Sequence, residues 1–204
     1  MKPLIIPGVP EQVKGSFHDS ESYRDFHSSE TALESYQILK AHFTSVNNWK
    51  TYCNGKSADF KLFDASGNPI ARNPQEDDLI RIDIPGPGNP ESGGYEWVKI
   101  TKITDQSLLP GEIESLLMKC VPTKIPGQNE NEHISHFYSG DSASTFKIAR
   151  GEKFIKIGVY GRNETPNMNT TFSGKIRNLL IALGGMFGMS KIQWKIFAEK
   201  MLKF

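Results

Sequence analysis

The sequence is poor in cysteine and lacks an apolar run long enough to cross a membrane. Its two cysteines, Cys53 and Cys120, lie far apart and form no CxxC pair, which argues against a zinc ribbon or a thioredoxin-like site. We expect both to be buried free thiols. The most apolar stretch near the C-terminus, LLIALGGMFGM at 179–189, is rich in glycine and shorter than the roughly 20 residues that a spanning helix needs. We therefore expect no membrane insertion.

A signal peptide and an excess of one charge are also missing. The N-terminal MKPLIIPGVPEQ has only a short apolar patch that prolines interrupt, so the predicted location is cytoplasmic. The 24 Lys and Arg nearly balance the 23 Asp and Glu, and a net charge of +1 argues against a general nucleic-acid binder. The charge is uneven, however: residues 59–96 hold eight acidic and three basic side chains, and residues 171–204 hold one acidic and six basic.

Familiar catalytic and cofactor motifs are absent as well. The sequence contains no GxSxG, no HExxH, no Asp-rich calcium loop and no GK[ST], and no cofactor is expected. The glycines of IPGPGNPESGGYEWV precede a strand rather than a helix, so they favour a hairpin loop or a lid over a phosphate-binding loop. With 204 residues, of which 37% are hydrophobic and 23% charged, the chain is typical of one globular domain spanning residues 1–204.

A helix followed by strands is what the sequence does contain. SSETALESYQILKAHF predicts a helix that one of the two serines at 28–29 can cap. Its helical period places Tyr36, Leu39 and Phe43 on one buried stripe. A loop or short second helix follows, in which we expect Trp49 to be an anchor of the core.

Between residues 59 and 161 the pattern changes to six strands. Runs of alternating apolar and polar residues are separated by turn signals such as ASGN and RGEK. In DDLIRIDIP, for example, Ile80 and Ile82 share one face. Arg81 and Asp83 share the other face, which we interpret as solvated rather than as an acid/base pair. Such alternation is typical of an antiparallel sheet with one covered face and one wet face.

The C-terminal segment can supply the cover. TTFSGKIRNLLIALGGMF and SKIQWKIFAEKMLKF together predict a long amphipathic helix, which the glycines at 184, 185 and 188 break or kink. Its apolar stripe contains Trp194, Phe197, Ala198 and Met201, with lysines on the opposite side. The predicted fold class is therefore α+β, with a curved antiparallel β-sheet packed on a long C-terminal helix.

This order of elements resembles that of the START-like helix-grip superfamily, in which a curved antiparallel sheet wraps a C-terminal helix. The order is a possible strand near 11–17, a helix, a turn around Trp49, six strands and the terminal helix, so the resemblance covers nearly the whole chain. The motifs GRNETPN and RIDIPGPG…GYEWV look like signatures of an uncharacterised bacterial family. The resemblance implies lipid, sterol or polyketide-type ligands, and it implies no role for any single residue.

Polar side chains gather in GRNETPN, at the end of the last predicted strand. Arg162 and Glu164 can form an ion pair or recognise the polar groups of a ligand, and Asn163 offers an amide donor and acceptor. The favoured interpretation is a structural corner, because the chain leaves a strand here and its backbone groups need partners. Contact with a ligand is the alternative.

Two further segments contain reactive residue types. NENEHISHFYSGD places His133 and His136 near Asp141 and two glutamates, which are metal ligands by type. In a loop that leads into a strand this spacing does not bring the histidines together, so we interpret them as surface residues and expect no metal site. Cys120 lies in line with Met118 on an apolar face, where a raised pKa would make the thiol inert.

These patterns favour a non-catalytic protein that binds a small apolar or amphipathic ligand between the sheet and the C-terminal helix. One alternative is a protein-interaction or assembly component, or a homo-oligomer, that uses the aromatic and lysine-rich C-terminal helix. The other is a cyclase- or hydrolase-like enzyme that uses Arg162 with Glu164 or Asp83. The predicted ligand-binding residues are Tyr95, Trp97, Met118, Arg162, Asn163, Glu164 and Trp194, and the predicted pocket wall also includes Phe146, Ile157 and Met186.

Overall fold

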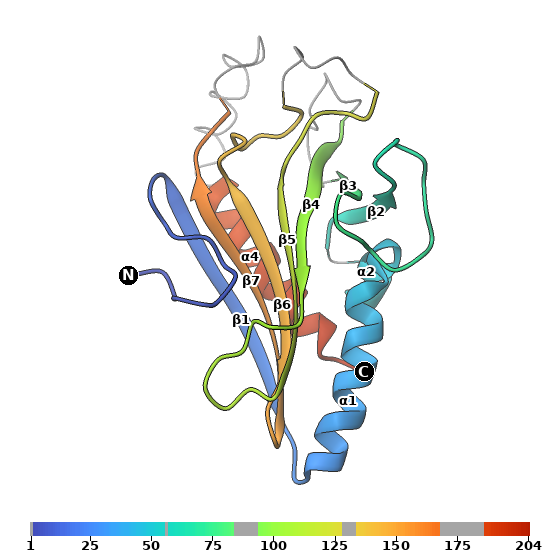
Figure 1. Ribbon diagram of the computed structural model, residues 1–204, viewed down its shortest axis with the longest axis vertical. Coiled ribbons are helices and arrows are strands. Elements are labelled where there is room, and N and C mark those ends of the chain that lie inside the picture. Colours follow the sequence, from blue (N-terminus) through green and yellow to red (C-terminus); the bar gives the residue numbers. More distant parts are fainter. Residues whose placement is uncertain (1, 56, 84–93, 128–133, 168–185) are drawn as a thin grey trace.

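A seven-stranded antiparallel sheet forms the centre of the protein, in the order β1-β7-β6-β5-β4-β3-β2 (Figure 1). The computed structural model describes residues 2–55, 57–83, 94–127, 134–167 and 186–204, with side chains from 191 onward in the last range. From β2 to β7 each strand pairs with the next along the chain, and β1 pairs with β7. The strands are β1 (Ser16–Asp25), β2 (Asp59–Phe63), β3 (Leu79–Asp83), β4 (Glu96–Thr104), β5 (Glu114–Pro122), β6 (Ala143–Arg150) and β7 (Phe154–Glu164).

The register of the strands places their apolar side chains together on one face, called here the inner face. Ile80 of β3 lies opposite Val98 of β4, and Met118 of β5 lies opposite Phe146 of β6. The β1–β7 and β4–β5 pairs each contain a register shift. Such bulges bend a strand and increase its twist, and they account for the curvature of the sheet.

The six strands predicted between residues 59 and 161 are all present, and the fold is α+β with a curved antiparallel sheet, as predicted. The strand expected near residues 11–17 is β1, which begins later, at Ser16, and runs to Asp25. Its sequence, SFHDSESYRD, has few apolar residues. For that reason the alternating pattern that identifies a half-buried strand is weak there.

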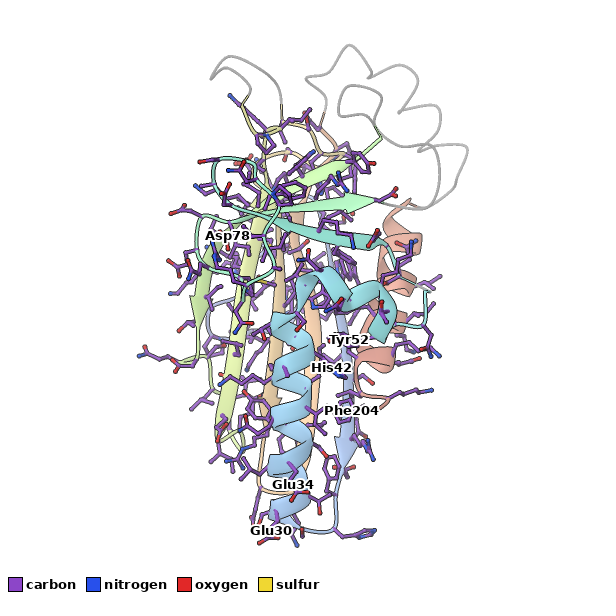
Figure 2. All side chains as sticks on the ribbon, turned by 90° about the vertical axis from the view of Figure 1, so that its right-hand side faces the viewer. Glu30, Glu34, His42, Tyr52, Asp78 and Phe204 are labelled. Atoms are coloured by element: carbon purple, nitrogen blue, oxygen red, sulfur yellow. The ribbon has the colours of Figure 1, made fainter. Side chains whose placement is uncertain are left out.

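Helix α1 (Ser29–Thr44) lies against the inner face (Figure 2), as the sequence period predicts. The Ser28 hydroxyl accepts a hydrogen bond from the Thr31 N–H (3.3 Å), which satisfies one of the free donors at the start of the helix. Tyr36, Leu39 and Phe43 are almost fully buried. A 3₁₀ turn, η1 (Val46–Asn48), and the short helix α2 (Trp49–Tyr52) then return the chain to the edge of the sheet.

The C-terminal helix α4 (Met186–Met201) packs on the same face. Phe197, Ala198 and Met201 are fully buried and Trp194 is partly buried, which confirms the predicted stripe. The predicted helical stretch at 168–185 lies outside the described residues. Among the described helices, none combines the length and apolarity that crossing a bilayer requires.

The opposite, outer face of the sheet is not the solvated surface that the alternation predicted. Tyr160, Lys147 and Arg162 all point to this face and have almost no exposed area. The N-terminal segment covers part of it, with the Leu4 backbone bonded to Arg162, and the Ser107 hydroxyl donates a hydrogen bond to the Pro7 carbonyl. These covering segments are irregular, and irregular chain has no periodic signal in the sequence.

Candidate functional site

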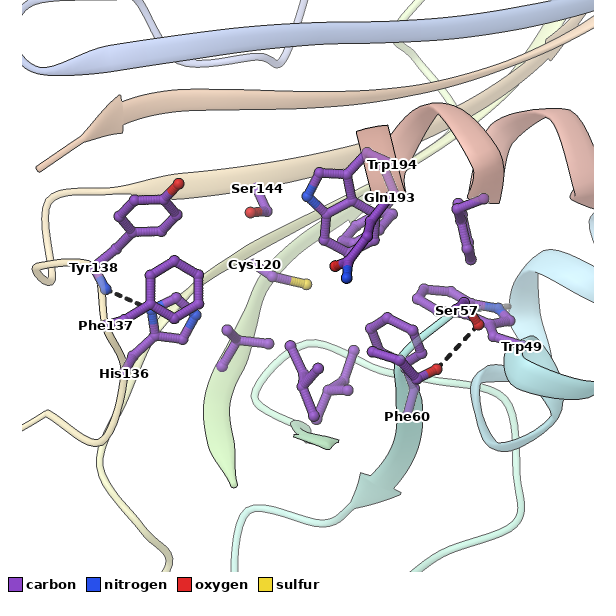
Figure 3. A pocket seen from close by; sticks show the side chains of 16 residues that line it. Trp49, Ser57, Phe60, Cys120, His136, Phe137, Tyr138, Ser144, Gln193 and Trp194 are labelled. Atoms are coloured by element: carbon purple, nitrogen blue, oxygen red, sulfur yellow. Dashed lines mark hydrogen bonds between the residues drawn. The ribbon is translucent and has the colours of Figure 1, made fainter. Parts of the chain in front are cut away.

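A cavity lies between the inner face of the sheet, α2 and α4 (Figure 3). Its free volume is about 70 Å³. Sixteen of the described residues line it, and they come from parts of the chain that are distant in sequence. Ile80, Ile82 and Val98 of β3 and β4 form an aliphatic wall, which the alternation of these strands turns inward.

An aromatic cluster forms the end of the cavity near α2. The ring centroid of Trp49 lies 5.1 Å from that of Phe60 and 5.2 Å from those of Phe146 and Phe197. Trp194 of α4 meets Phe146 edge to face at 5.3 Å. Offset and edge-to-face pairs at these distances attract beyond simple burial. The indole N–H of Trp49 donates to the Phe43 carbonyl (3.0 Å), so its one polar group is satisfied outside the cavity.

The other end of the cavity is formed by residues 136–138, just before β6 (Figure 3). The His136 ring stacks on Phe137, with centroids 4.4 Å apart. Its Nδ1 accepts a hydrogen bond from the Tyr138 backbone N–H at 3.0 Å. Burial lowers the pKa of His136 to about 3, and the ring is therefore neutral at physiological pH. Because Nδ1 is the acceptor, the single ring proton is on Nε2.

Hydrogen bonds on both sides hold the 136–138 segment in place. On one side, the Glu96 carboxyl of β4 accepts the Phe137 N–H through Oε2 at 2.9 Å. On the other, Asn167 donates its backbone N–H to the Phe137 carbonyl (2.8 Å) and its side-chain amide to the His136 carbonyl (3.1 Å). Burial raises the pKa of Glu96 to about 8, so this carboxyl is mostly protonated at neutral pH.

The remaining polar side chains of the cavity are uncharged. Burial raises the pKa of the Cys120 thiol to about 12, which keeps it protonated and a poor nucleophile. Ser57 donates its hydroxyl hydrogen to the Ala58 carbonyl (3.0 Å), whereas Ser144 and Gln193 lie beside Trp194 (Figure 3). No Asp, Glu, Lys or Arg is among the sixteen lining residues.

Arg162, the predicted polar anchor, lies on the outer face of β7 and away from the cavity. Its Nη2 donates to the Leu4 carbonyl (2.9 Å) and forms an ion pair with Asp19 (2.7 Å). Its Nη1 donates to the carbonyls of His18 (3.1 Å) and Gly161 (2.8 Å). These contacts tie the N-terminal segment to the sheet, so the structure places Arg162 in the arrangement described above as a structural corner.

Asn163 and Glu164 follow Arg162 at the end of β7, and the Glu164 carboxylate lies on the inner side of the strand, where a Cβ on Gly161 would point. Asn163 has a positive φ of 54°, which asparagine tolerates better than most residues, and its Oδ1 accepts from the Val13 (2.8 Å) and Lys14 (3.1 Å) N–H groups. Glu164 Oε1 lies 2.9 Å from Nδ1 of His18, and both side chains are buried. Neither residue lines the cavity.

The four other predicted ligand-binding residues do not come together, because they lie on different faces of the sheet. Trp194 lines the cavity, and Met118 is buried in the core without lining it. Trp97 points to the outer face, where its ring centroid lies 5.0 Å from that of Phe63. The Arg81 guanidinium stacks over Tyr95 at 4.1 Å. Of the other predicted wall residues, Phe146 lines the cavity, Ile157 does not, and the side chain of Met186 is outside the described residues.

His136 is the main cavity residue that sequence reasoning missed. It was interpreted as a surface histidine, and this is wrong, because the residue is buried against Phe137 and the sheet. His133 lies outside the described residues, and Asp141 pairs with Lys14 at 2.6 Å on the surface. Within the described part of the chain, no three His, Cys, Asp or Glu side chains are placed to hold a metal ion. The run His-Phe-Tyr at 136–138 is the signal that could have indicated burial, since Phe is among the residue types most often buried and Tyr and His are intermediate.

Comparison with known proteins finds similar solved structures but no matching protein-family model and no matching curated sequence. A hypothetical protein of Helicobacter pylori matches with a TM-score of 0.49 and 7% identity, covering 93% of this chain and 87% of that one. The latex-like protein 151 of Panax ginseng has a TM-score of 0.38 and 10% identity, over 83% and 95% of the two chains. Truncated norcoclaurine synthase of Thalictrum flavum has a TM-score of 0.35 and 10% identity, over 95% and 96%.

With TM-scores below 0.5, none of these similarities assigns a family or a function to this chain.

Proposed function

We propose that this protein binds a small, largely apolar molecule in the cavity between the sheet and α4, without a catalytic step. The observation that supports the proposal is the cavity itself, which has aromatic and aliphatic walls and a few uncharged polar groups. Ligand sites in proteins have this composition, since apolar walls supply affinity and sparse polar groups fix orientation.

The size of the cavity limits what it admits as it stands. A dry cavity of about 150 Å³ accommodates benzene, and typical ligand pockets have about 300–1,000 Å³. The 70 Å³ of this cavity therefore suits a molecule of a few heavy atoms. A larger ligand, such as benzene or one of its derivatives, enters only when lining side chains move, and we expect Gln193 and Trp194 to move for it. Gln193 and Trp194 of α4 are only partly buried and can move with the smallest loss of packing, whereas Phe197 is fully buried.

The alternatives from the sequence have less support. An assembly role through the C-terminal helix would be favoured by exposed Trp194 and Phe197, but Phe197 is fully buried and Trp194 packs on Phe146. An enzyme would need an ionisable group poised near neutral pH inside the cavity. Two ionisable lining groups, His136 and Cys120, have pKa values shifted to about 3 and about 12, so neither is a good acid or base at pH 7.

The proposal can be tested by filling the cavity. Ser144 lines the cavity on β6 and is partly buried, so Ser144→Leu adds apolar volume there without removing a hydrogen bond of the fold. Native mass spectrometry of protein purified from cells should detect a retained small molecule on the wild type and none on this variant. Ser66→Leu, at an exposed turn, is the matched control and should behave as the wild type.

A titration with benzene, followed by NMR shifts of the indole N–H groups of Trp49 and Trp194, gives a second measurement. Saturable shifts in the wild type and in Ser66→Leu, and none in Ser144→Leu, are expected. The proposal is wrong if no molecule is retained and benzene shifts the indole N–H signals equally in the wild type, Ser66→Leu and Ser144→Leu.

A further inference from the structure

The charge of the cavity walls restricts the ligands that can enter. None of the sixteen lining residues carries a carboxylate, ammonium or guanidinium group. Burial keeps His136 and Cys120 in their neutral forms at pH 7. A charged ligand would lose its hydration without gaining a counter-ion, and that is a large penalty in a buried site. An uncharged ligand avoids this penalty.

The His136 ring is held in one tautomer and one orientation. The Tyr138 N–H occupies Nδ1 at 3.0 Å, and stacking on Phe137 fixes the plane of the ring. The hydrogen bonds from Glu96 and Asn167 to this segment hold its backbone. The proton on Nε2 therefore has a fixed direction, and in Figure 3 this nitrogen lies on the side of the ring that faces away from Tyr138 and into the cavity. Within the described residues, Nε2 forms no hydrogen bond.

The two ends of the cavity differ in polarity. The rings of Trp49 and Phe60 form one end, and there the Ser57 hydroxyl donates to the Ala58 carbonyl. His136 is at the other end, and Ser144 lies between the ends (Figure 3). A ligand that spans the cavity thus meets aromatic rings at one end and an N–H donor at the other.

From this arrangement we infer that the cavity selects uncharged ligands that carry one hydrogen-bond acceptor, such as a carbonyl or ether oxygen, and that the Nε2–H of His136 donates to this acceptor. The apolar body of the ligand packs on the rings of Trp49, Phe60 and Phe146. The inference rests on the proposed function, because it assigns the ligand class and the orienting residue of the same cavity.

Three probes of similar size distinguish the possible ligand classes. Ethylbenzene has a ring and no acceptor, acetophenone has a ring and a carbonyl, and benzoate has a ring and a negative charge. Dissociation constants can be measured by NMR titration at pH 7. We expect acetophenone to bind about 3- to 10-fold more tightly than ethylbenzene, which is the typical net effect of one hydrogen bond. Benzoate should bind most weakly of the three.

Variants of His136 test whether this residue is the donor. His136→Phe keeps an aromatic ring and removes the N–H. The affinity of this variant for acetophenone should therefore fall to its affinity for ethylbenzene, which should itself be unchanged. His136→Gln keeps an N–H donor and should retain part of the preference, and it also provides a folded variant if the phenylalanine disturbs the segment. His27→Phe, at an exposed position, is the matched control and should leave all three affinities unchanged.

The outcomes separate this inference from the proposed function. If no probe binds the wild type, both fail. If the probes bind but benzoate binds best, or if ethylbenzene equals acetophenone, the cavity binds ligands and the inference about their class is wrong. If acetophenone keeps its preference in His136→Phe, the donor is another residue and the role assigned to His136 is wrong.

Discussion

The cavity and the covered outer face are both buried and both contain polar side chains, but they keep these side chains in opposite charge states. Around the cavity the polar groups are neutral, as the pKa shifts of His136 and Glu96 show. On the outer face they are ion pairs: Lys147 Nζ lies 2.6 Å from Glu112 Oε2, and Arg162 lies 2.7 Å from Asp19. Lys147 and Glu112 have only 1% and 2% of their side-chain area exposed.

The difference follows from what covers each region. The outer face is covered by irregular chain, whose backbone carbonyls are free to accept hydrogen bonds, and Arg162 binds the carbonyl of Leu4 in this way. Much of the cavity is covered by α2 and α4, whose backbone groups bond to one another. At the 136–138 end, the backbone N–H and carbonyl of Phe137 are already bonded to Glu96 and Asn167. A buried charge needs both a partner and further hydrogen bonds, so charges persist where irregular chain supplies them.

The largest expected effect comes from removing the arginine of the outer face. Arg162→Ala removes the ion-pair partner of Asp19 and one donor from each of three backbone carbonyls, which should lower the free energy of unfolding by about 3–5 kcal/mol. Urea unfolding measures the change. Because the cavity is on the other face of the sheet, the folded variant should bind the aromatic probes with wild-type affinity.

Arg24→Ala is the matched control for this prediction. Arg24 is exposed and donates only one described hydrogen bond, to the Phe204 carbonyl at 3.3 Å, so its removal should change stability by less than about 1 kcal/mol. Loss of probe binding in folded Arg162→Ala would contradict the separation of the two faces and would return Arg162 to the role of ligand anchor.

A somewhat smaller effect is expected for the other buried ion pair. Lys147→Met leaves Glu112 with Lys156, which is 3.3 Å from its other carboxylate oxygen, so the loss should be about 2–3 kcal/mol. The double variant Lys147→Met with Glu112→Leu should recover part of this loss, because no unpaired carboxylate remains. Lys99→Ala removes an exposed partner of Asp77 and should change stability by less than about 1 kcal/mol. Equal losses of stability in Lys147→Met and Lys99→Ala would contradict the argument that burial makes the first ion pair more important.

The comparison also explains which parts of the structure the sequence predicts. The inner face is built by regular elements, and their periods are visible in the sequence: Leu39 and Phe43 recur at helical spacing, and Ile80 and Ile82 alternate on a strand. Hydrophobic period identifies such elements because burial on one face selects apolar residues at fixed intervals. The fold class and the stripe that contains Phe197 could therefore be predicted.

The cavity and the cover of the outer face could not be predicted in the same way. His136 is in a loop, and its burial depends on Glu96 and Asn167, which hold the loop from distant positions in the chain. Arg162 depends in the same way on the backbone of Leu4. No local period records such contacts, so the sequence identified the polar residues of GRNETPN without showing which face of the sheet they occupy.

A third prediction uses pH to test the neutral state of Glu96. The pKa of Glu96 is about 8 in the folded protein, compared with 4.5 for an unburied glutamate. Between pH 4.5 and 8 the folded state therefore binds more protons than the unfolded state. Stability from this group is thus fully present below pH 4.5 and is lost as pH rises through about 8. Between pH 6.5 and 9 the wild type should lose on the order of 2 kcal/mol from this source.

Glu96→Gln isolates that contribution. The amide oxygen can still accept the Phe137 N–H, and the side chain no longer titrates, so the fall in stability should be smaller than in the wild type. His136 does not interfere, because its lowered pKa makes stability rise with pH only from about 3 to 6.5. Glu34→Gln, an exposed position on α1, should keep the wild-type slope. Parallel pH profiles for wild type and Glu96→Gln would show that Glu96 is ionised.

The smallest expected effect compares the two buried thiols. Cys120 lines the cavity and Cys53 does not, and burial raises the pKa of both thiols, to about 12 and about 11. Replacing either by alanine should cost about 1 kcal/mol in urea unfolding, since each removes one buried sulfur atom. Only Cys120→Ala enlarges the cavity, so only this variant should bind acetophenone or a larger ring more tightly than the wild type. Equal changes in probe affinity in the two variants would mean that the probes bind elsewhere.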